Sequence, residues 1–266
     1  MAIVTGGQKS RYYEAYSEID VSFNRQVIQY TGLNPHDVFL RLTGSQIPCI
    51  IYSSSMIGAK VLANLETNHF EKIRESKNKV SLRFSFRRED NSIPRTFFIT
   101  SKVTGFRPYD QKRSKTNFVS LSYTQKPPDD LIEILGTLLD TNINSKKRKE
   151  HRIVIDESAI RMLGLKSRSS LLRFRDGLQK AIVRDLSFTG AKVLTAGHIG
   201  AAENKASILQ LGFSDLAAPI LLPNRIIRTE EIGERKDITA VALLYDEPRI
   251  PLAYKTRINQ FFSVKK

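Results

Sequence analysis

Two polar motifs in the second half of the chain hold side chains that suit an anionic ligand. Arg148 and Arg152 lie four residues apart in a basic stretch, and the run Asp185-Leu186-Ser187-Phe188-Thr189-Gly190 follows a predicted strand. A guanidinium fork matches phosphate oxygens, and also the O6 and N7 acceptors of guanine, bidentately. Each motif alone is also compatible with a solvated surface or an ordinary turn, so their combination and order are what indicate a binding site.

An Arg-x-x-x-Arg pair before the first strand of a domain, followed by Asp-x-Ser-x-x-Gly after a later strand, resembles the signature of PilZ domains. Those domains are six-stranded β-barrels that bind the bacterial second messenger cyclic di-GMP. The resemblance covers residues 148–266 directly and reaches residues 20–141 more weakly, through an internal repeat. The layout is similar to that of the PlzA-type receptors, in which a degenerate PilZ-like domain precedes a ligand-binding PilZ domain.

The resemblance implies that cyclic di-GMP is the ligand and that no other cofactor is required. Arg148 and Arg152, held on a flexible segment, are then expected to wrap over the ligand, where they would grip its phosphates or guanines and stack on the purine rings. Asp185 is an acceptor for guanine N1–H and N2–H₂, an edge that bears donors. A carboxylate that faced only phosphates would repel them, so Asp185 favours recognition of the base.

The resemblance also gives expected roles to the remaining motif positions. Ser187 offers a hydroxyl to base or phosphate, and Gly190 lets the backbone turn and approach the ligand closely. Lys147 and His151, which neighbour the two arginines, are further candidates for ligand contact.

The elements that must position these motifs occur twice in the chain. A shift of 132 residues aligns positions 24–62 with 156–194 without a gap and gives twelve identities in 39 positions. Average composition would give about 6% by chance. Asn24 and Asp156 are both good N-cap residues before a short helical pattern, and Gly32 and Gly164 both stand where that helix would end. The sequence therefore predicts one domain type, duplicated.

Short runs of β-forming residues fill most of each half. The predicted strands are 39–42, 47–52, 60–65, 80–86, 96–104 and 117–123, then 171–175, 180–184, 191–195, 206–213, 219–228 and 239–245. Strands do not alternate with long helices, which disfavours a parallel α/β fold. The prediction is a mainly β protein with two tandem six-stranded antiparallel β-barrels and short flanking helices.

A helical pattern with an apolar stripe occupies residues 129–139, and a basic segment follows it. Residues 142–152 contain five basic residues, one acidic residue and a single apolar one, Ile143. This composition is typical of a linker. The predicted organisation is an N-terminal domain at 1–141, a linker at 142–152 that carries the arginine pair, and a cyclic di-GMP-binding domain at 153–266.

The first half lacks the chemically decisive side chains of the second. Tyr16 and Asp20 stand where the repeat has Arg148 and Arg152, and Ser53 stands where it has Asp185. The serine and glycine that follow are retained, as Ser55 and Gly58. We therefore expect residues 1–141 to be a companion domain that does not bind the messenger.

The charge balance leaves a second function open. Lys and Arg number 42 against 27 Asp and Glu, a net charge of +15, which favours a polyanionic partner. DNA or RNA binding, with or without control by cyclic di-GMP, is the alternative to a simple receptor, and an unidentified protein effector is a further candidate partner. A basic patch with aromatic neighbours is predicted from Arg107, Lys112, Arg113, Lys115, Phe106 and Tyr109.

Several other classes are disfavoured. The single cysteine, Cys49, excludes a disulfide within the chain and a thiolate zinc site, and the four histidines lack metal-like spacing. No nucleophile or acid–base constellation is assembled, so an enzyme is not expected. No apolar run reaches the roughly 18 residues that a membrane span needs, and the start of the sequence lacks a signal-peptide core. A cytoplasmic protein that does not insert into membranes is the expectation.

Overall fold

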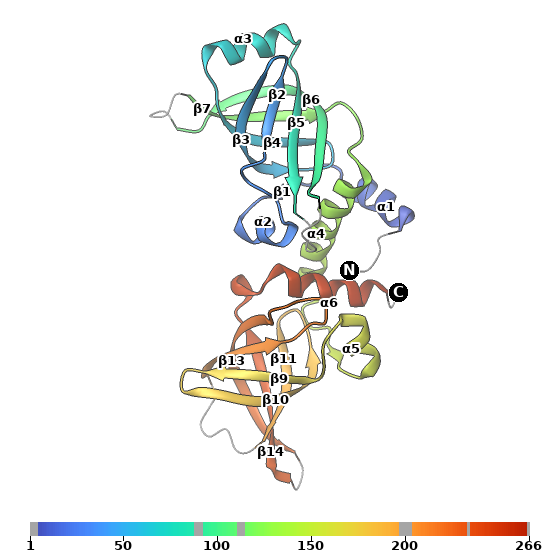
Figure 1. Ribbon diagram of the computed structural model, residues 1–266. Coiled ribbons are helices and arrows are strands. Elements are labelled where there is room, and N and C mark those ends of the chain that lie inside the picture. Colours follow the sequence, from blue (N-terminus) through green and yellow to red (C-terminus); the bar gives the residue numbers. More distant parts are fainter. Residues whose placement is uncertain (1–4, 88–92, 111–114, 197–203, 233–234, 265–266) are drawn as a thin grey trace. The chain divides into compact units, whose positions relative to one another are not determined.

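The chain forms two compact units, Met1–Leu139 and Asp140–Lys266, and each contains one β-barrel (Figure 1). This computed structural model describes residues 5–87, 93–110, 115–196, 204–232 and 235–264. The two barrels confirm the predicted fold class.

In the first unit, six strands close into an antiparallel barrel in the order β3-β2-β5-β6-β7-β4, because β4 pairs back onto β3. A two-residue strand, β1, adds to the outer end of β3. The strands are β1 (Val21–Ser22), β2 (Phe39–Leu42), β3 (Ser45–Ser54), β4 (Gly58–Asn64), β5 (Lys79–Phe86), β6 (Arg95–Pro108) and β7 (Thr116–Tyr123). Alternate side chains point inward, so Leu40, Val61 and Phe84 are fully buried in the barrel core.

The second unit repeats this topology. Its barrel has the order β10-β9-β12-β13-β14-β11, is closed by pairing of β11 with β10, and receives the two-residue strand β8 on β10. The strands are β8 (Ile153–Val154), β9 (Ser169–Phe174), β10 (Gly177–Leu186), β11 (Gly190–Ala196), β12 (Ala206–Leu211), β13 (Ile220–Ile232) and β14 (Arg235–Tyr245). Leu172, Val193 and Leu222 are fully buried in the core.

Helices flank the strands, and the sequence predicts those that follow Asn24 and Asp156 and the one that begins at residue 129. The helices are α1 (Gly6–Tyr16), α2 (Arg25–Thr31), α3 (Thr67–Glu75), α4 (Asp129–Lys147), α5 (Glu157–Leu163), α6 (Leu252–Val264) and a 3₁₀ turn, η1 (Glu247–Arg249). The side chains of Asn24 and Asp156 accept hydrogen bonds from the amides of Val27 and Ala159, which confirms both predicted N-caps. Gly32 and Gly164 end these helices with φ of 69° each, in the left-handed region that favours glycine.

The basic segment differs from the sequence prediction. Helix α4 continues through Lys147, so residues 142–147 of the predicted linker are helical. Lys146 and Lys147 lie in its last turn, where positive side chains stabilise the partial negative charge of the helix end. Only the five residues 148–152 lie between this helix and β8. The helices α1 and α3 were not predicted.

Candidate ligand-binding site

The pairing of β8 with β10 positions the two motifs of the second barrel. Val154 pairs with Asp185 and Ile153 with Leu186, and the β10–β11 register shifts between Val183 and Asp185. Such a bulge re-aims a side chain at the edge of a ladder. The short strand β8 therefore brings the residue before it, Arg152, to the side of Asp185.

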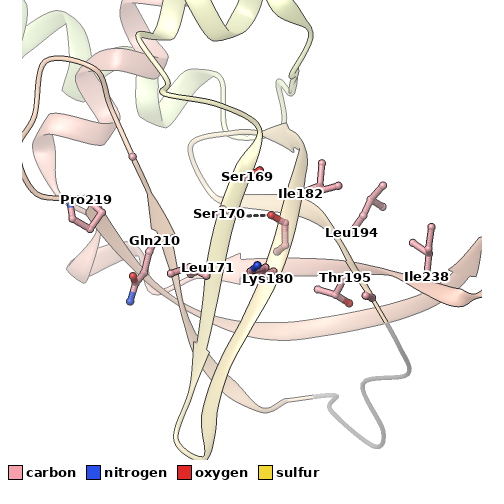
Figure 2. Close-up of a pocket in the computed structure, with 13 residues that line it drawn as sticks. Ser169, Ser170, Leu171, Lys180, Ile182, Leu194, Thr195, Gln210, Pro219 and Ile238 are labelled. Atoms are coloured by element: carbon pink, nitrogen blue, oxygen red, sulfur yellow. Dashed lines mark hydrogen bonds between the residues drawn. The ribbon is translucent and has the colours of Figure 1, made fainter.

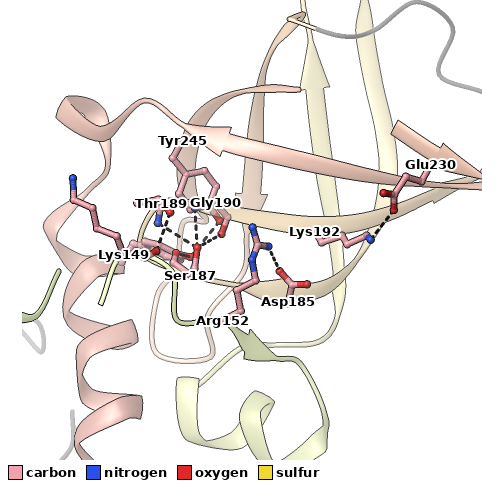
Figure 3. Close-up of polar contacts among 10 residues, drawn as sticks. Lys149, Arg152, Asp185, Ser187, Thr189, Gly190, Lys192, Glu230 and Tyr245 are labelled. Atoms are coloured by element: carbon pink, nitrogen blue, oxygen red, sulfur yellow. Dashed lines mark hydrogen bonds and ion pairs between the residues drawn. The ribbon is translucent and has the colours of Figure 1, made fainter. Parts of the chain in front are cut away.

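Arg152 and Asp185 form an ion pair on the surface of this barrel (Figure 3). The distance from Arg152 Nη1 to Asp185 Oδ1 is 2.5 Å, and the two side chains are 47% and 13% exposed. One arginine of the first motif thus already engages the acceptor of the second. A ligand that uses both groups must open this pair or bind across it.

Arg148 is not part of this ion pair. Its guanidinium carbon lies 5.7 Å from the ring centroid of Phe262, on α6, and the ring of His151 lies 5.9 Å from the same centroid. Phe188, inside the Asp-x-Ser-x-x-Gly motif, also packs on Phe262, at 6.3 Å. Phe262 therefore links the two motifs. The sequence patterns gave Phe262 no expected role, so this contact was not predicted.

Lys149 ties the arginine segment to the motif turn. Thr189 Oγ1 donates a hydrogen bond to the Lys149 carbonyl oxygen at 3.0 Å (Figure 3), and Lys149 Nζ lies 3.4 Å from Glu247 Oε2. Lys147, a predicted candidate, is the exposed last residue of α4. Segment 148–152 is thus anchored at its backbone while the guanidinium of Arg152 stays half-exposed.

The hydroxyl of Ser187 closes the turn. Ser187 Oγ accepts from the amides of Thr189 and Gly190 at 3.3 and 3.0 Å and donates to the Gly190 carbonyl at 3.1 Å. The residue is 1% exposed. The geometry thus gives Ser187 a structural function in the turn, in addition to the ligand contact expected from the sequence.

Gly190 is required by close strand packing. A Cβ at this position would lie 2.2 Å from the carbonyl oxygen of Leu243 on β14, and Gly190 is not among the glycines with positive φ. The structure thus gives a packing reason for this glycine, and the close approach to a ligand that the sequence suggests stays a prediction.

The same turn persists in the first barrel, which explains why its serine and glycine remain. The amide of Ser55 donates to the Gly58 carbonyl at 2.9 Å, as the amide of Ser187 does to the Gly190 carbonyl at 2.8 Å. A Cβ on Gly58 would lie 2.4 Å from the Leu121 carbonyl oxygen. Ser-x-x-Gly is thus a structural element of both barrels, whereas the arginines and the aspartate are found only in the second.

The first barrel offers a negative group at the equivalent place. Ser53 Oγ donates a hydrogen bond to Asp20 Oδ2 at 3.2 Å, in the position that Arg152 and Asp185 occupy in the second barrel. Tyr16 ends α1 and stacks on Tyr12, with ring centroids 6.0 Å apart. A carboxylate at this position repels phosphate.

Two buried tyrosines stabilise the motif turn through hydrogen bonds. Tyr254, on α6, donates to the Ser187 carbonyl oxygen at 2.8 Å, and its hydroxyl lies 3.2 Å from that of Tyr245. Burial raises the pKa of both phenols, and the nearby Asp185 carboxylate raises them further. Both groups therefore remain neutral and able to donate.

A second ion pair, between Lys192 and Glu230, lies beside Asp185. Lys192 is the cross-strand partner of Asp185 on β11, and its Nζ lies 2.9 Å from Glu230 Oε2 (Figure 3). Glu230 also forms an ion pair with Arg228, and the distance from Arg228 Nη2 to Glu230 Oε1 is 2.8 Å. The hydrogen bond from Lys192, followed by the charge of Arg228, lowers the pKa of Glu230.

A concavity of about 700 Å³ lies elsewhere on the second barrel (Figure 2). Leu171, Ile182, Leu194 and Ile238 contribute to its mainly apolar lining, and Lys180 is its one charged residue. None of the predicted site residues lines it. An anion with two phosphates has little to gain from this surface, so it is not the candidate site.

The predicted basic patch of the first unit is only partly assembled. Tyr109 packs on Phe118 at 5.6 Å, and Phe118 packs on Tyr52 at 5.1 Å. Arg107 is the cross-strand partner of Phe118. Phe106 instead packs on Phe70 of α3, so the two predicted aromatic residues belong to different clusters.

Two further predicted members of this patch, Lys112 and Arg113, lie outside the described residues. Lys115 Nζ lies 3.6 Å from Glu66 Oε1.

Within the described ranges, no cluster of three or more His, Cys, Asp or Glu residues could hold a metal ion. In that same part of the chain, no helix combines the length and the hydropathy needed to cross a membrane.

Comparison with known proteins gives one family match and several similar chains. The model of the PilZN3 domain matches residues 8–142. A protein of Treponema denticola named cyclic di-GMP binding protein is 36% identical over 264 residues, which cover 99% of this chain and 84% of the relative.

Two solved structures are also similar. The crystal structure of the Borreliella burgdorferi PlzA protein in complex with c-di-GMP has 22% sequence identity and a TM-score of 0.44, with 96% of this chain and 98% of that one covered. That of YcgR from Escherichia coli in complex with c-di-GMP has 11% identity and a TM-score of 0.31, with 90% and 86% covered. On the family match and the identity to the T. denticola protein, the chain belongs to the PilZN3-domain family of PilZ-type proteins.

Proposed function

We propose that this protein is a cytoplasmic cyclic di-GMP receptor without catalytic activity, which binds the messenger between segment 148–152 and the second barrel. One observation carries the proposal: β8 places Arg152 beside Asp185 on an exposed barrel surface, whereas the first barrel has Asp20 and Ser53 there. The relative from T. denticola, which bears the name cyclic di-GMP binding protein, supports it.

The chemistry of each group fits one part of the ligand. Asp185 accepts from guanine N1–H and N2–H₂, which frees the Arg152 guanidinium to engage a phosphate or the O6 and N7 edge of a guanine. Loss of the Arg152–Asp185 ion pair on ligand binding costs little free energy, because the Arg152 side chain is half-exposed and the pair is weak. Ser187 and Gly190 hold the turn that presents Asp185, and any contact they make with the ligand comes second to that function.

Arg148 completes the site by leaving Phe262. Arg148 and Phe262 are both partly exposed, and a guanidinium over a ring at such a position is held by about 1 kcal/mol. A charge-assisted hydrogen bond to phosphate provides more, about 1.5–3 kcal/mol. The messenger is therefore expected to draw Arg148 from the ring toward the Arg152–Asp185 pair, with His151 and Lys147 near its path.

Signalling follows from where the arginines lie in the chain. They lie in the five-residue segment between α4 and β8. Helix α4 begins in the first compact unit and ends in the second. Ligand contact at both arginines restricts this connection, so the messenger biases the arrangement of the two domains. In this account residues 1–141 are a non-binding companion, and residues 153–266, with segment 142–152, form the messenger-binding domain.

Calorimetric titration of the full chain with cyclic di-GMP tests the proposal, with cyclic di-AMP as the matched control. Adenine lacks the N1–H and N2–H₂ donors that Asp185 accepts, so we expect saturable binding of cyclic di-GMP and at least tenfold weaker binding of cyclic di-AMP. Equal affinity for both would remove base recognition from Asp185, and absence of cyclic di-GMP binding would refute the receptor function.

A second function, binding of single-stranded nucleic acid, is favoured by the aromatic cluster of the first barrel. Tyr52 and Tyr109, which flank Phe118, are 54% and 52% exposed, and Arg107 lies opposite Phe118 in the ladder. Exposed rings next to cations provide stacking platforms for bases. Fluorescence anisotropy with a labelled single-stranded RNA, over a salt series, tests this function. Substitution of both tyrosines by alanine should abolish binding, and an unchanged affinity would refute it.

A further inference from the structure

A second concave surface of the second unit is lined by four arginines. It has a volume of about 710 Å³ and is built by the outer faces of β9, β12 and β13 together with the end of β14 and η1. Its arginines are Arg173, Arg175, Arg225 and Arg249, and we call it the arginine groove. Such a volume is within the range of small-molecule sites, roughly 300–1,000 Å³.

The arginine groove has a net positive charge, because its four arginines outnumber its two acidic residues. Its two acidic residues already have partners: Asp246 lies 3.6 Å from Arg249, and Glu247 lies 3.4 Å from Lys149. The other three arginines form no ion pair with any residue in the described part of the chain. Three like charges around one concavity raise its electrostatic potential and attract an anion of several charges.

The floor of the arginine groove is apolar. Ile208 pairs with Arg173 on one side and with Pro223 on the other, and Leu244 pairs with Arg225, so apolar side chains alternate with guanidinium groups across the sheet. A ligand that satisfies both must combine several negative charges with a flat or apolar body. Guanidinium forks match phosphate oxygens bidentately, and a nucleobase covers an apolar floor.

We infer that the arginine groove binds a nucleoside polyphosphate, with its phosphates on Arg173, Arg175 and Arg225 and its base over Ile208, Pro223 and Leu244. This goes beyond the messenger function, because Arg148, Arg152 and Asp185 do not line the groove. The groove adjoins the messenger site, because Tyr245 and Glu247, which line the groove, belong to the contacts of the motif turn and of Lys149. The arginines that hold each ligand are different, so we expect the protein to bind both ligands at once.

Calorimetric titration of the full chain with magnesium-free GTP tests the inference. The groove variant is R173A/R225A, and the matched control is R161A/R168A, which removes the same charge from exposed positions outside the groove. Sodium tripolyphosphate and guanosine, each titrated alone, separate the contribution of the phosphates from that of the base. R173Q/R225Q removes the charge but keeps a polar side chain with the first three carbons of arginine, and it replaces the alanine variant if the thermal midpoint of that variant falls.

We expect saturable GTP binding that weakens at least tenfold in the groove variant and less than twofold in the control, with GTP tighter than tripolyphosphate and guanosine weakest. An equal loss in both double variants would show only a general charge effect, and tripolyphosphate as tight as GTP would remove the base from the site. Absence of GTP binding, or its loss in R148A/R152A, would also overturn the inference. Titration of each variant with cyclic di-GMP keeps a failure here distinct from a failure of the receptor function.

Discussion

Replacement of Arg152 isolates the contact on which the messenger site depends. In the free protein this guanidinium pairs with Asp185 at 2.5 Å, but its side chain is 47% exposed, so the pair contributes at most about 1 kcal/mol to stability. In the complex the same group makes charge-assisted hydrogen bonds of about 1.5–3 kcal/mol. The difference predicts that R152A loses about 2 kcal/mol of binding free energy, which is roughly a 30-fold rise in Kd.

Two further variants make this measurement specific. R152K keeps the charge but lacks the planar fork, so we expect an affinity between those of wild type and R152A. R161A, on α5, removes an exposed guanidinium away from the site and should leave Kd within twofold. Thermal midpoints should fall by no more than about 4 °C, because little stability depends on the ion pair.

Calorimetry with cyclic di-GMP decides the outcome. If R152A bound as tightly as R161A, Arg152 would not contact the ligand and the reasoning from the β8 register would be refuted. If R152K bound as tightly as wild type, charge alone, without fork geometry, would explain the role of Arg152.

Five further outcomes are expected. G190A should lower the free energy of unfolding by about 1–3 kcal/mol in urea melts, since its Cβ would lie 2.2 Å from the Leu243 carbonyl oxygen. Y254F loses the 2.8 Å hydrogen bond to the motif turn and should cost about 1 kcal/mol in the same assay. R148A/R152A should abolish all saturable cyclic di-GMP binding by the full chain, and residual binding would place a second site on the first barrel. Burial raises the pKa of the Cys49 thiol to about 12, so native protein should react slowly with a thiol reagent at pH 8. Because only the unfolded chain loses that proton above about pH 8.5, the free energy of unfolding should fall as pH rises further.

The fold was predictable because its signals are local and occur twice. Alternation along each strand, the N-caps Asn24 and Asp156, and the left-handed glycines that end α2 and α5 are all visible in the sequence, and the structure contains each of them. The sequence did not predict that α4 extends to Lys147, because the last residues of the helix lack apolar periodicity. These residues continue a helix that has already formed, and the lysines in its last turn stabilise its end.

The surroundings of the site were less predictable. The sequence indicated that two motifs meet, but not that Tyr254 supports Ser187 or that Phe262 holds Arg148, because these contacts join segments far apart in the chain. The structural function of Gly190 was also hidden, since it depends on the approach of a strand more than 50 residues away. Such contacts depend on tertiary packing, which local patterns do not encode.

Hydrogen–deuterium exchange of the full chain, with and without saturating cyclic di-GMP, locates the bound messenger without any substitution. If the messenger binds between segment 148–152 and the second barrel, exchange should slow at the backbone amides of segments 148–152 and 185–190 and stay unchanged in residues 53–58 of the first barrel. Slower exchange at 53–58 with unchanged 148–152 and 185–190 would contradict this proposal, and would place the messenger on the barrel that lacks the arginine pair.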